Sequence, residues 1–127
     1  MTKFKTQGFT STFKNARKGF RLVVKSERNL RIHLLVASLV MCCGFLFRFT
    51  GLEFCILLFA ITQVIVAEMF NTSIEFALDS IYHNRYSKMV GMAKDISAGA
   101  VMFATVTSCA VGFTLFGKAI FDLIVRH

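Results

Sequence analysis

The sequence contains no proline and no tryptophan, and it has few acidic residues, seven against 15 basic ones. It has no G-x-x-x-x-G-K-[ST] segment and no kinase-type glycine-rich loop, which excludes these two common nucleotide-binding loops. None of its four cysteines forms a C-x-x-C pair, so neither a zinc site nor a disulfide framework is expected. A cleavable signal peptide is not expected either, because the first apolar run begins only near Ile32, after a long polar arm.

Apolar residues dominate what is present: they make up 55% of the 127 residues, and the mean hydropathy is +0.62, too high for an ordinary soluble domain. Three runs carry no charge, at 34–47, 54–67 and 96–117. The third is long enough to cross a bilayer of ~30 Å, which takes about 20 helical residues. The first run is flanked by basic residues whose side chains can reach the headgroups, and the second continues as a helix toward Leu78 without a breaker. These runs predict an all-α integral membrane protein with a single domain, 1–127, and spans at about 30–49, 52–80 and 94–117.

Basic residues are concentrated at one end of the chain. Nine of the 15 precede Ile32, and only Glu27 opposes them: Lys3, Lys5, Lys14, Arg17, Lys18, Arg21, Lys25, Arg28 and Arg31. A nucleic-acid-binding protein can carry such an arm, but beside long apolar runs it indicates the cytoplasmic side of a membrane, so no nucleic-acid partner is expected. We therefore predict a multi-pass protein of the inner (cytoplasmic) membrane of the cell, with a cytoplasmic N-terminus and an external C-terminus. The second loop, Tyr82 to Lys94, is also basic and lies on the cytoplasmic side in this topology.

The N-terminal arm has a helical periodicity of its own. Its apolar residues recur at helical spacing, at Phe9, Phe13, Ala16, Phe20 and Val23/Val24. Basic residues fill the positions between them. The pattern predicts an amphipathic helix over about 9–27 that lies on the cytoplasmic leaflet. Its role could be simple anchoring or closure over a headgroup site.

A stripe of polar residues follows the second apolar run. Four side chains lie at offsets of 0, 3, 7 and 11 residues: Glu68, Asn71, Glu75 and Asp79. At about 100° per residue these offsets place all four on one narrow helix face. Like charges so arranged repel one another, and acidic residues within a membrane segment are costly, so a functional site is the default interpretation. Clustered carboxylates near a membrane surface suit a hard cation such as Mg²⁺. The alternatives are acids that pair to hold helices together, or acids solvated beyond the membrane, although the latter suits Glu68 poorly.

Four further residues are ambiguous when taken alone. Lys94 and Asp95 precede the third span, where a lysine could balance phosphate charge or simply flank the membrane. Glu27 could form a weak surface ion pair with Arg28 or Arg31. His33 has no partner at metal-ligand spacing and is interpreted as an interfacial polar residue.

Three blocks of this sequence together resemble the prokaryotic diacylglycerol kinase family. The run Glu68-x-x-Asn71-Thr72-Ser73-Ile74-Glu75-x-x-x-Asp79 is similar to the family signature E-x-x-N-[ST]-[AS]-I-E-x-x-x-D. The run Ala93-Lys94-Asp95-x-x-Ala98-x-Ala100-Val101 resembles its second block. The N-terminal block, Phe13-x-x-Ala16-x-x-Gly19 followed by Glu27-Arg28-Asn29-x-Arg31-Ile32-His33, is similar to that of its undecaprenol kinase branch. The resemblance covers roughly residues 9–115. The chain departs from the family pattern at Tyr86-Ser87-Lys88, where the stretch between blocks is one residue longer.

The resemblance implies a lipid kinase that transfers the γ-phosphate of MgATP to a lipid alcohol. Family members are homotrimers of three-span subunits with a surface helix. The expected substrate is undecaprenol, giving undecaprenyl phosphate, and diacylglycerol is the alternative. A holin-like pore or an assembly subunit is a distant non-enzymatic alternative, because such proteins are also short, basic and triple-spanning but do not need this acidic stripe.

The resemblance also implies roles for individual residues. Glu68 is expected to act as the general base that takes the proton of the lipid hydroxyl. Glu27 and Glu75 are expected to hold Mg²⁺ and, with Asn71, Lys94 and Asp95, to bind ATP. Asp79 is expected to support this site without touching the nucleotide, and Asn29 and Arg31 to lie on the side of the lipid headgroup.

Overall fold

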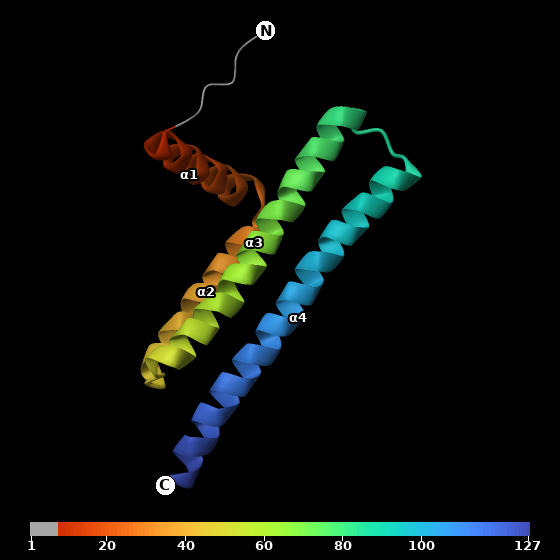
Figure 1. Ribbon diagram of the computed structural model, residues 1–127. Helices are drawn as coiled ribbons and strands as arrows, with labels where there is room; N and C mark the ends of the chain where they lie inside the picture. The colour runs from red at the N-terminus through yellow and green to blue at the C-terminus, as the bar shows by residue number, and fades with distance from the viewer. Residues whose placement is uncertain (1–7) are drawn as a thin grey trace.

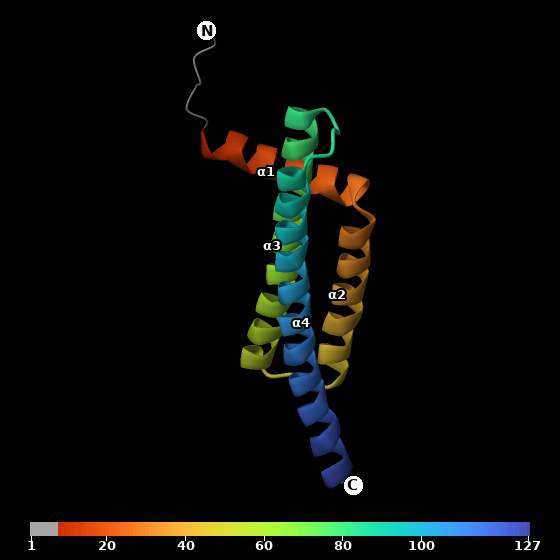
Figure 2. The same cartoon turned by 90° about the vertical axis from the view of Figure 1, so that its right-hand side faces the viewer.

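The protein is a four-helix chain, and the computed structural model describes residues 8–127. The helices are α1 (Phe9–Ser26), α2 (Arg28–Leu46), α3 (Gly51–Tyr82) and α4 (Lys88–Val125). α2, α3 and α4 run alongside one another, and α1 lies across the bundle near the start of α2 (Figures 1 and 2). Lys3 and Lys5, which contribute to the basic arm, lie outside the described residues.

Local capping explains where α3 and α4 begin and end. The Thr50 hydroxyl accepts from the Glu53 backbone at 3.3 Å, and the Thr50 N–H donates to the Glu53 carboxylate at 2.9 Å, which forms a reciprocal capping box. α3 ends where His83 and Asn84 adopt left-handed conformations, with φ of 51° and 60°. The Ser87 hydroxyl caps α4 by accepting from the Val90 N–H at 3.2 Å.

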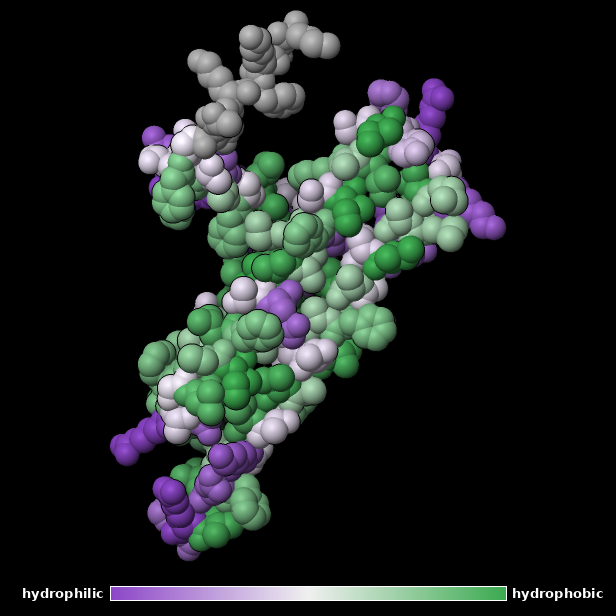
Figure 3. All heavy atoms as spheres, in the orientation of Figure 1, coloured by the Kyte–Doolittle hydropathy of each residue, from purple (hydrophilic) through white to green (hydrophobic). Residues whose placement is uncertain are grey.

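Three helices, α2, α3 and α4, are long and apolar enough to cross a membrane. Their side chains are largely exposed along the bundle, where a bilayer would replace water as the solvent. On the face in Figure 3, apolar residues cover most of the bundle and hydrophilic residues gather mainly toward its ends. The all-α membrane fold predicted from the sequence is therefore confirmed. The predicted limits of the spans stay predictions, because the ends of a helix do not mark the membrane surfaces.

α3 packs most extensively against α4 and also contacts α2, and phenylalanine rings gather at the turn that joins α2 and α3. Leu30, Leu57 and Ala60 are almost fully buried. Near the turn, ring centroids lie 4.9 Å apart for Phe49 and Phe116 and 4.7 Å apart for Phe45 and Phe54. These phenylalanine contacts connect the turn to α4. They fix the far end of the bundle, and the polar side chains lie toward the other end.

Candidate functional site

Glu68 is a buried carboxylate on α3, at the level where α1 joins α2. Its side chain is only 6% exposed, and its Oε1 lies 3.3 Å from Nε2 of His33 on α2. Thr72, one helical turn farther along α3, is 1% exposed, and its hydroxyl has no hydrogen-bond partner among residues 8–127. Charge buried at such a position requires a partner, and in this chain His33 supplies one.

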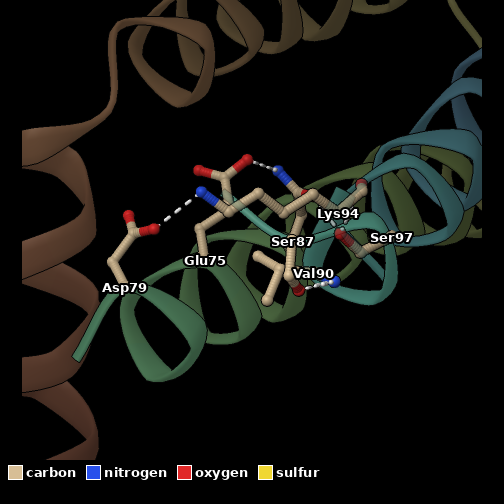
Figure 4. A network of polar contacts seen from close by, with 7 residues as sticks. Glu75, Asp79, Ser87, Val90, Lys94 and Ser97 are labelled. Atoms are coloured by element: carbon tan, nitrogen blue, oxygen red, sulfur yellow. Dashed lines mark hydrogen bonds and ion pairs between the residues drawn. The ribbon is translucent and has the colours of Figure 1, made fainter. Parts of the chain in front are cut away.

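Asn71 connects two helices. Its amide nitrogen donates to Oε1 of Glu75 at 3.3 Å, one turn away on α3. Its amide oxygen accepts from the hydroxyl of Ser97 on α4 at 2.7 Å, and this hydroxyl also lies 2.9 Å from the Lys94 carbonyl. Figure 4 shows this α3–α4 network from close by. Asn71 is thus held on both sides, which orients the amide next to the Glu75 carboxylate.

Lys94 and Asp79 form the second link between α3 and α4. The Lys94 ammonium lies 2.6 Å from Asp79 Oδ1, and each side chain is more than a third exposed (Figure 4). A pair this exposed contributes little to stability, about 0–1 kcal/mol. The pair can therefore open at small cost, which leaves the Lys94 ammonium available to another anion.

Glu27 stands between α1 and α2, at the end of one helix and the start of the next. Arg31 fixes this joint, because its guanidinium donates to the carbonyls of Val24 at 3.1 Å and Lys25 at 2.9 Å, in the last turn of α1. A basic group at a helix C-terminus is favourable for the helix dipole. Arg31 thereby links α1 to α2, and Asn29 beside it is exposed.

Within residues 8–127 no three His, Cys, Asp or Glu side chains are grouped as a complete metal site. A complete protein site is not what Mg²⁺ requires, because it is commonly bound by one or two carboxylates together with substrate phosphates. Glu27 and Glu75 take part in none of the three ion pairs that these residues form. Their oxygen chemistry therefore fits Mg²⁺ carried in with a nucleotide. Asp95, the remaining predicted site residue, is exposed.

An apolar groove of about 360 Å³ lies between α2, α3 and α4. Its lining runs from His33 and Ile65 at one end to Phe116 at the other. The α4 residues that border it, Thr105 to Phe116, cover about 16 Å at 1.5 Å per residue. The groove is shaped for an apolar chain, and its His33 end adjoins the Glu68 carboxylate.

The structure thus connects Asn71 to Glu75 and Asp79 to Lys94, whereas Glu68 faces α2 instead of α4. Two contributing residues, Ser97 and His33, were not predicted from the sequence to belong to the site, and His33 was interpreted only as an interfacial polar residue. Ser97 carried a weak signal, because it follows Lys94 by one helical turn in a run of small residues. His33 belongs to the N-terminal block, but nothing in the sequence paired it with Glu68.

Comparison with known proteins identifies the family of this chain. The family model for prokaryotic diacylglycerol kinase matches residues 14–116. An undecaprenol kinase of Bacillus subtilis (strain 168) is 33% identical over 108 residues, which cover 85% of this chain and 87% of that protein. A diacylglycerol kinase of Synechocystis sp. (strain ATCC 27184 / PCC 6803 / Kazusa) is 27% identical over 114 residues, 90% of this chain and 65% of that protein. The chain belongs to the prokaryotic diacylglycerol kinase family.

Proposed function

We propose that the protein transfers the γ-phosphate of MgATP to the hydroxyl group of undecaprenol, giving undecaprenyl phosphate. One observation carries the proposal: the buried Glu68 carboxylate lies between an apolar groove and the polar α3–α4 network. A binding site for a lipid alcohol requires apolar side chains around the lipid chain and a base within reach of the hydroxyl group. Undecaprenol is favoured over diacylglycerol because the relative with the higher identity is an undecaprenol kinase.

In this mechanism Glu68 accepts the proton of the lipid hydroxyl as its oxygen attacks the γ-phosphorus, and ADP leaves. Glu27 and Glu75 would hold Mg²⁺, which neutralises phosphate charge when bound. Lys94 exchanges its contact with Asp79 for a phosphate oxygen, while Asn71 and Asp95 contact the nucleotide. Phosphoryl transfer depends chiefly on such positioning and charge stabilisation, which explains how it can proceed without a P-loop.

The remaining parts of the proposal concern the assembly. α1 lies on the cytoplasmic leaflet, because Phe9 and Phe13 are exposed on a helix that crosses the bundle and is rich in basic residues. The chain assembles as a homotrimer in the inner membrane. α3 and α4 support this, since each keeps wide apolar faces that copies of the chain could cover.

A competition assay tests the function. The purified protein in detergent receives labelled ATP and equal amounts of undecaprenol and diacylglycerol, and we expect the label mainly in undecaprenyl phosphate. Label mainly in phosphatidic acid would select the diacylglycerol alternative, and label in neither lipid would contradict the proposed activity.

A variant of Glu68 tests its role in the chemical step. Glu68→Gln keeps the size of the side chain but cannot take the proton. We expect kcat to fall about 10²–10⁴-fold, the usual contribution of general base catalysis, with nucleotide binding little changed. Turnover within a few-fold of the wild type would show that Glu68 is not the base. Loss of nucleotide binding with residual turnover would instead place Glu68 in the metal site.

A further inference from the structure

His33 occupies the point where the apolar groove meets the buried carboxylate. Its imidazole lines the groove and is 28% exposed, and its Nε2 lies 3.3 Å from Glu68 Oε1. The other groove-lining residues of α2, namely Val36, Ala37 and Val40, have only hydrocarbon side chains. His33 is therefore the polar group that α2 presents at this end of the groove.

We infer that His33 is a positioning residue for Glu68: its imidazole holds one carboxylate oxygen, so that the other faces the hydroxyl of the lipid alcohol. This inference rests on the proposed function, in which Glu68 is the base. It adds a residue from a different helix to the machinery, and it makes the α2–α3 contact part of catalysis.

The burial of Glu68 is the first reason. A carboxylate that is 6% exposed loses most of its hydration, so leaving it without a partner would be strongly unfavourable. Neither Lys94 nor another cation of residues 8–127 reaches it, since Lys94 pairs with Asp79 and Lys118 with Glu53. The His33 imidazole is thus the group that pairs with this buried carboxylate.

Geometry is the second reason. A separation of 3.3 Å is slightly long for an N–H···O hydrogen bond, as such contacts often are before substrate binds. An imidazole with a proton on Nε2 donates to the carboxylate in either its neutral or its charged form. A carboxylate held on one oxygen has fewer accessible orientations, so its free oxygen is better placed for the proton transfer.

The test compares three substitutions that differ in where they place a donor. In His33→Gln the amide nitrogen can reach the position of Nε2, whereas in His33→Asn the amide is one bond shorter and stops near the position of Nδ1. His33→Leu fills the space without a donor. We expect kcat to fall about tenfold or more in the Leu and Asn variants and to recover most of the way in Gln, with the KM for ATP unchanged in all three.

Two controls separate positioning from damage to the fold. Ser38→Ala removes an exposed hydroxyl of α2 that bonds only to the Leu34 carbonyl, and it should leave kcat unchanged. In a Glu68→Gln background, His33→Leu should cost little more, because two residues that act as a unit are not additive. Thermal midpoints in detergent show whether each variant is folded, and the Gln and Asn pair keeps the test decisive if Leu is not.

The outcomes divide clearly. Wild-type turnover in His33→Leu or His33→Asn would overturn the inference, and so would a raised KM for the lipid with unchanged kcat, which would make His33 only a wall of the groove. A full additional loss in the Glu68→Gln background would also overturn it. Failure of the proposed function is distinguishable, because the wild-type protein would then label neither lipid. Failure of Glu68 as the base would instead appear as wild-type turnover in Glu68→Gln alone.

Discussion

The acidic side chains of residues 8–127 differ in what faces them. Glu53 and Asp79 face lysines, and Glu68 faces an imidazole. Glu27 and Glu75 take part in no ion pair, and the only hydrogen bond at the Glu75 carboxylate comes from a neutral amide. Carboxylates without a competing cation are able to bind a divalent ion, and Glu27 and Glu75 meet this condition, as do the exposed Asp95 and Asp122.

The first prediction concerns the proposed roles of Glu27 and Glu75 as Mg²⁺ ligands. Glu27→Gln and Glu75→Gln should each raise the KM for MgATP about tenfold or more, since losing one charge-assisted contact of 1.5–3 kcal/mol weakens binding by that much. Initial rates measured over a range of Mg²⁺ concentrations at fixed ATP provide the check. Asp122→Asn, an exposed change at the far end of α4, is the matched control. Unchanged KM values in both glutamine variants would show that these acids have no role in MgATP use.

Part of this site can be predicted from spacing, and part cannot. The interval between Asn71 and Glu75 is one helical turn, so their contact follows from the helix alone. The contact between His33 and Glu68 depends on the axial offset between α2 and α3, which the turn near Arg48 sets. Spacing along the chain does not predict that offset. Ser97 and Asn71 likewise meet only because α3 and α4 pack in one register.

At the scale of elements, the lengths of the helices explain where the site can lie. α3 has 32 residues and α4 has 38, which gives about 48 Å and 57 Å, whereas the hydrocarbon core is ~30 Å thick. Both helices are therefore longer than the hydrocarbon core is thick. In Figure 1 the end of α3 and the start of α4 continue past the start of α2. Continuation of the helix from the second run through Leu78 was predicted from the sequence, because no breaker occurs there, and the structure bears it out.

Gly44 allows the second prediction. This buried glycine of α2 lies against the phenylalanine contacts, and a Cβ there would stand 3.0 Å from Phe54 Cε1 and 3.2 Å from Phe49 Cδ2. Gly44→Val should lower stability by about 1–3 kcal/mol, the usual cost of overpacking, and it should lower the thermal midpoint in detergent. Gly117→Val, where nothing lies within 4 Å, is the control and should change little. A Gly44 variant as stable as the control would mean that the rings move aside freely.

Across the molecule as a whole, the basic residues and the predicted polar site residues lie toward the same end of the helix bundle. Within residues 8–127, α1 and the chain segments at the same end of the bundle carry ten of the basic residues, and the opposite end carries three, Arg48, Lys118 and Arg126. The predicted polar site residues from Asn71 to Asp95 also lie toward the α1 end. A kinase that uses ATP needs this end to face the cytoplasm, so the distribution of basic residues and the proposed chemistry require the same orientation.

The last prediction tests that orientation. With three spans the two termini lie on opposite sides, and the positive-inside rule places the N-terminus in the cytoplasm, because nine basic residues precede Ile32 while the C-terminal tail carries only Lys118 and Arg126. A fluorescent reporter that folds only in the cytoplasm should be bright on the N-terminus and dark on the C-terminus. A phosphatase active only outside should show the opposite pattern, which controls for expression. A bright C-terminal fusion would contradict this topology, because it would put the α3–α4 network on the side of the membrane where ATP is absent.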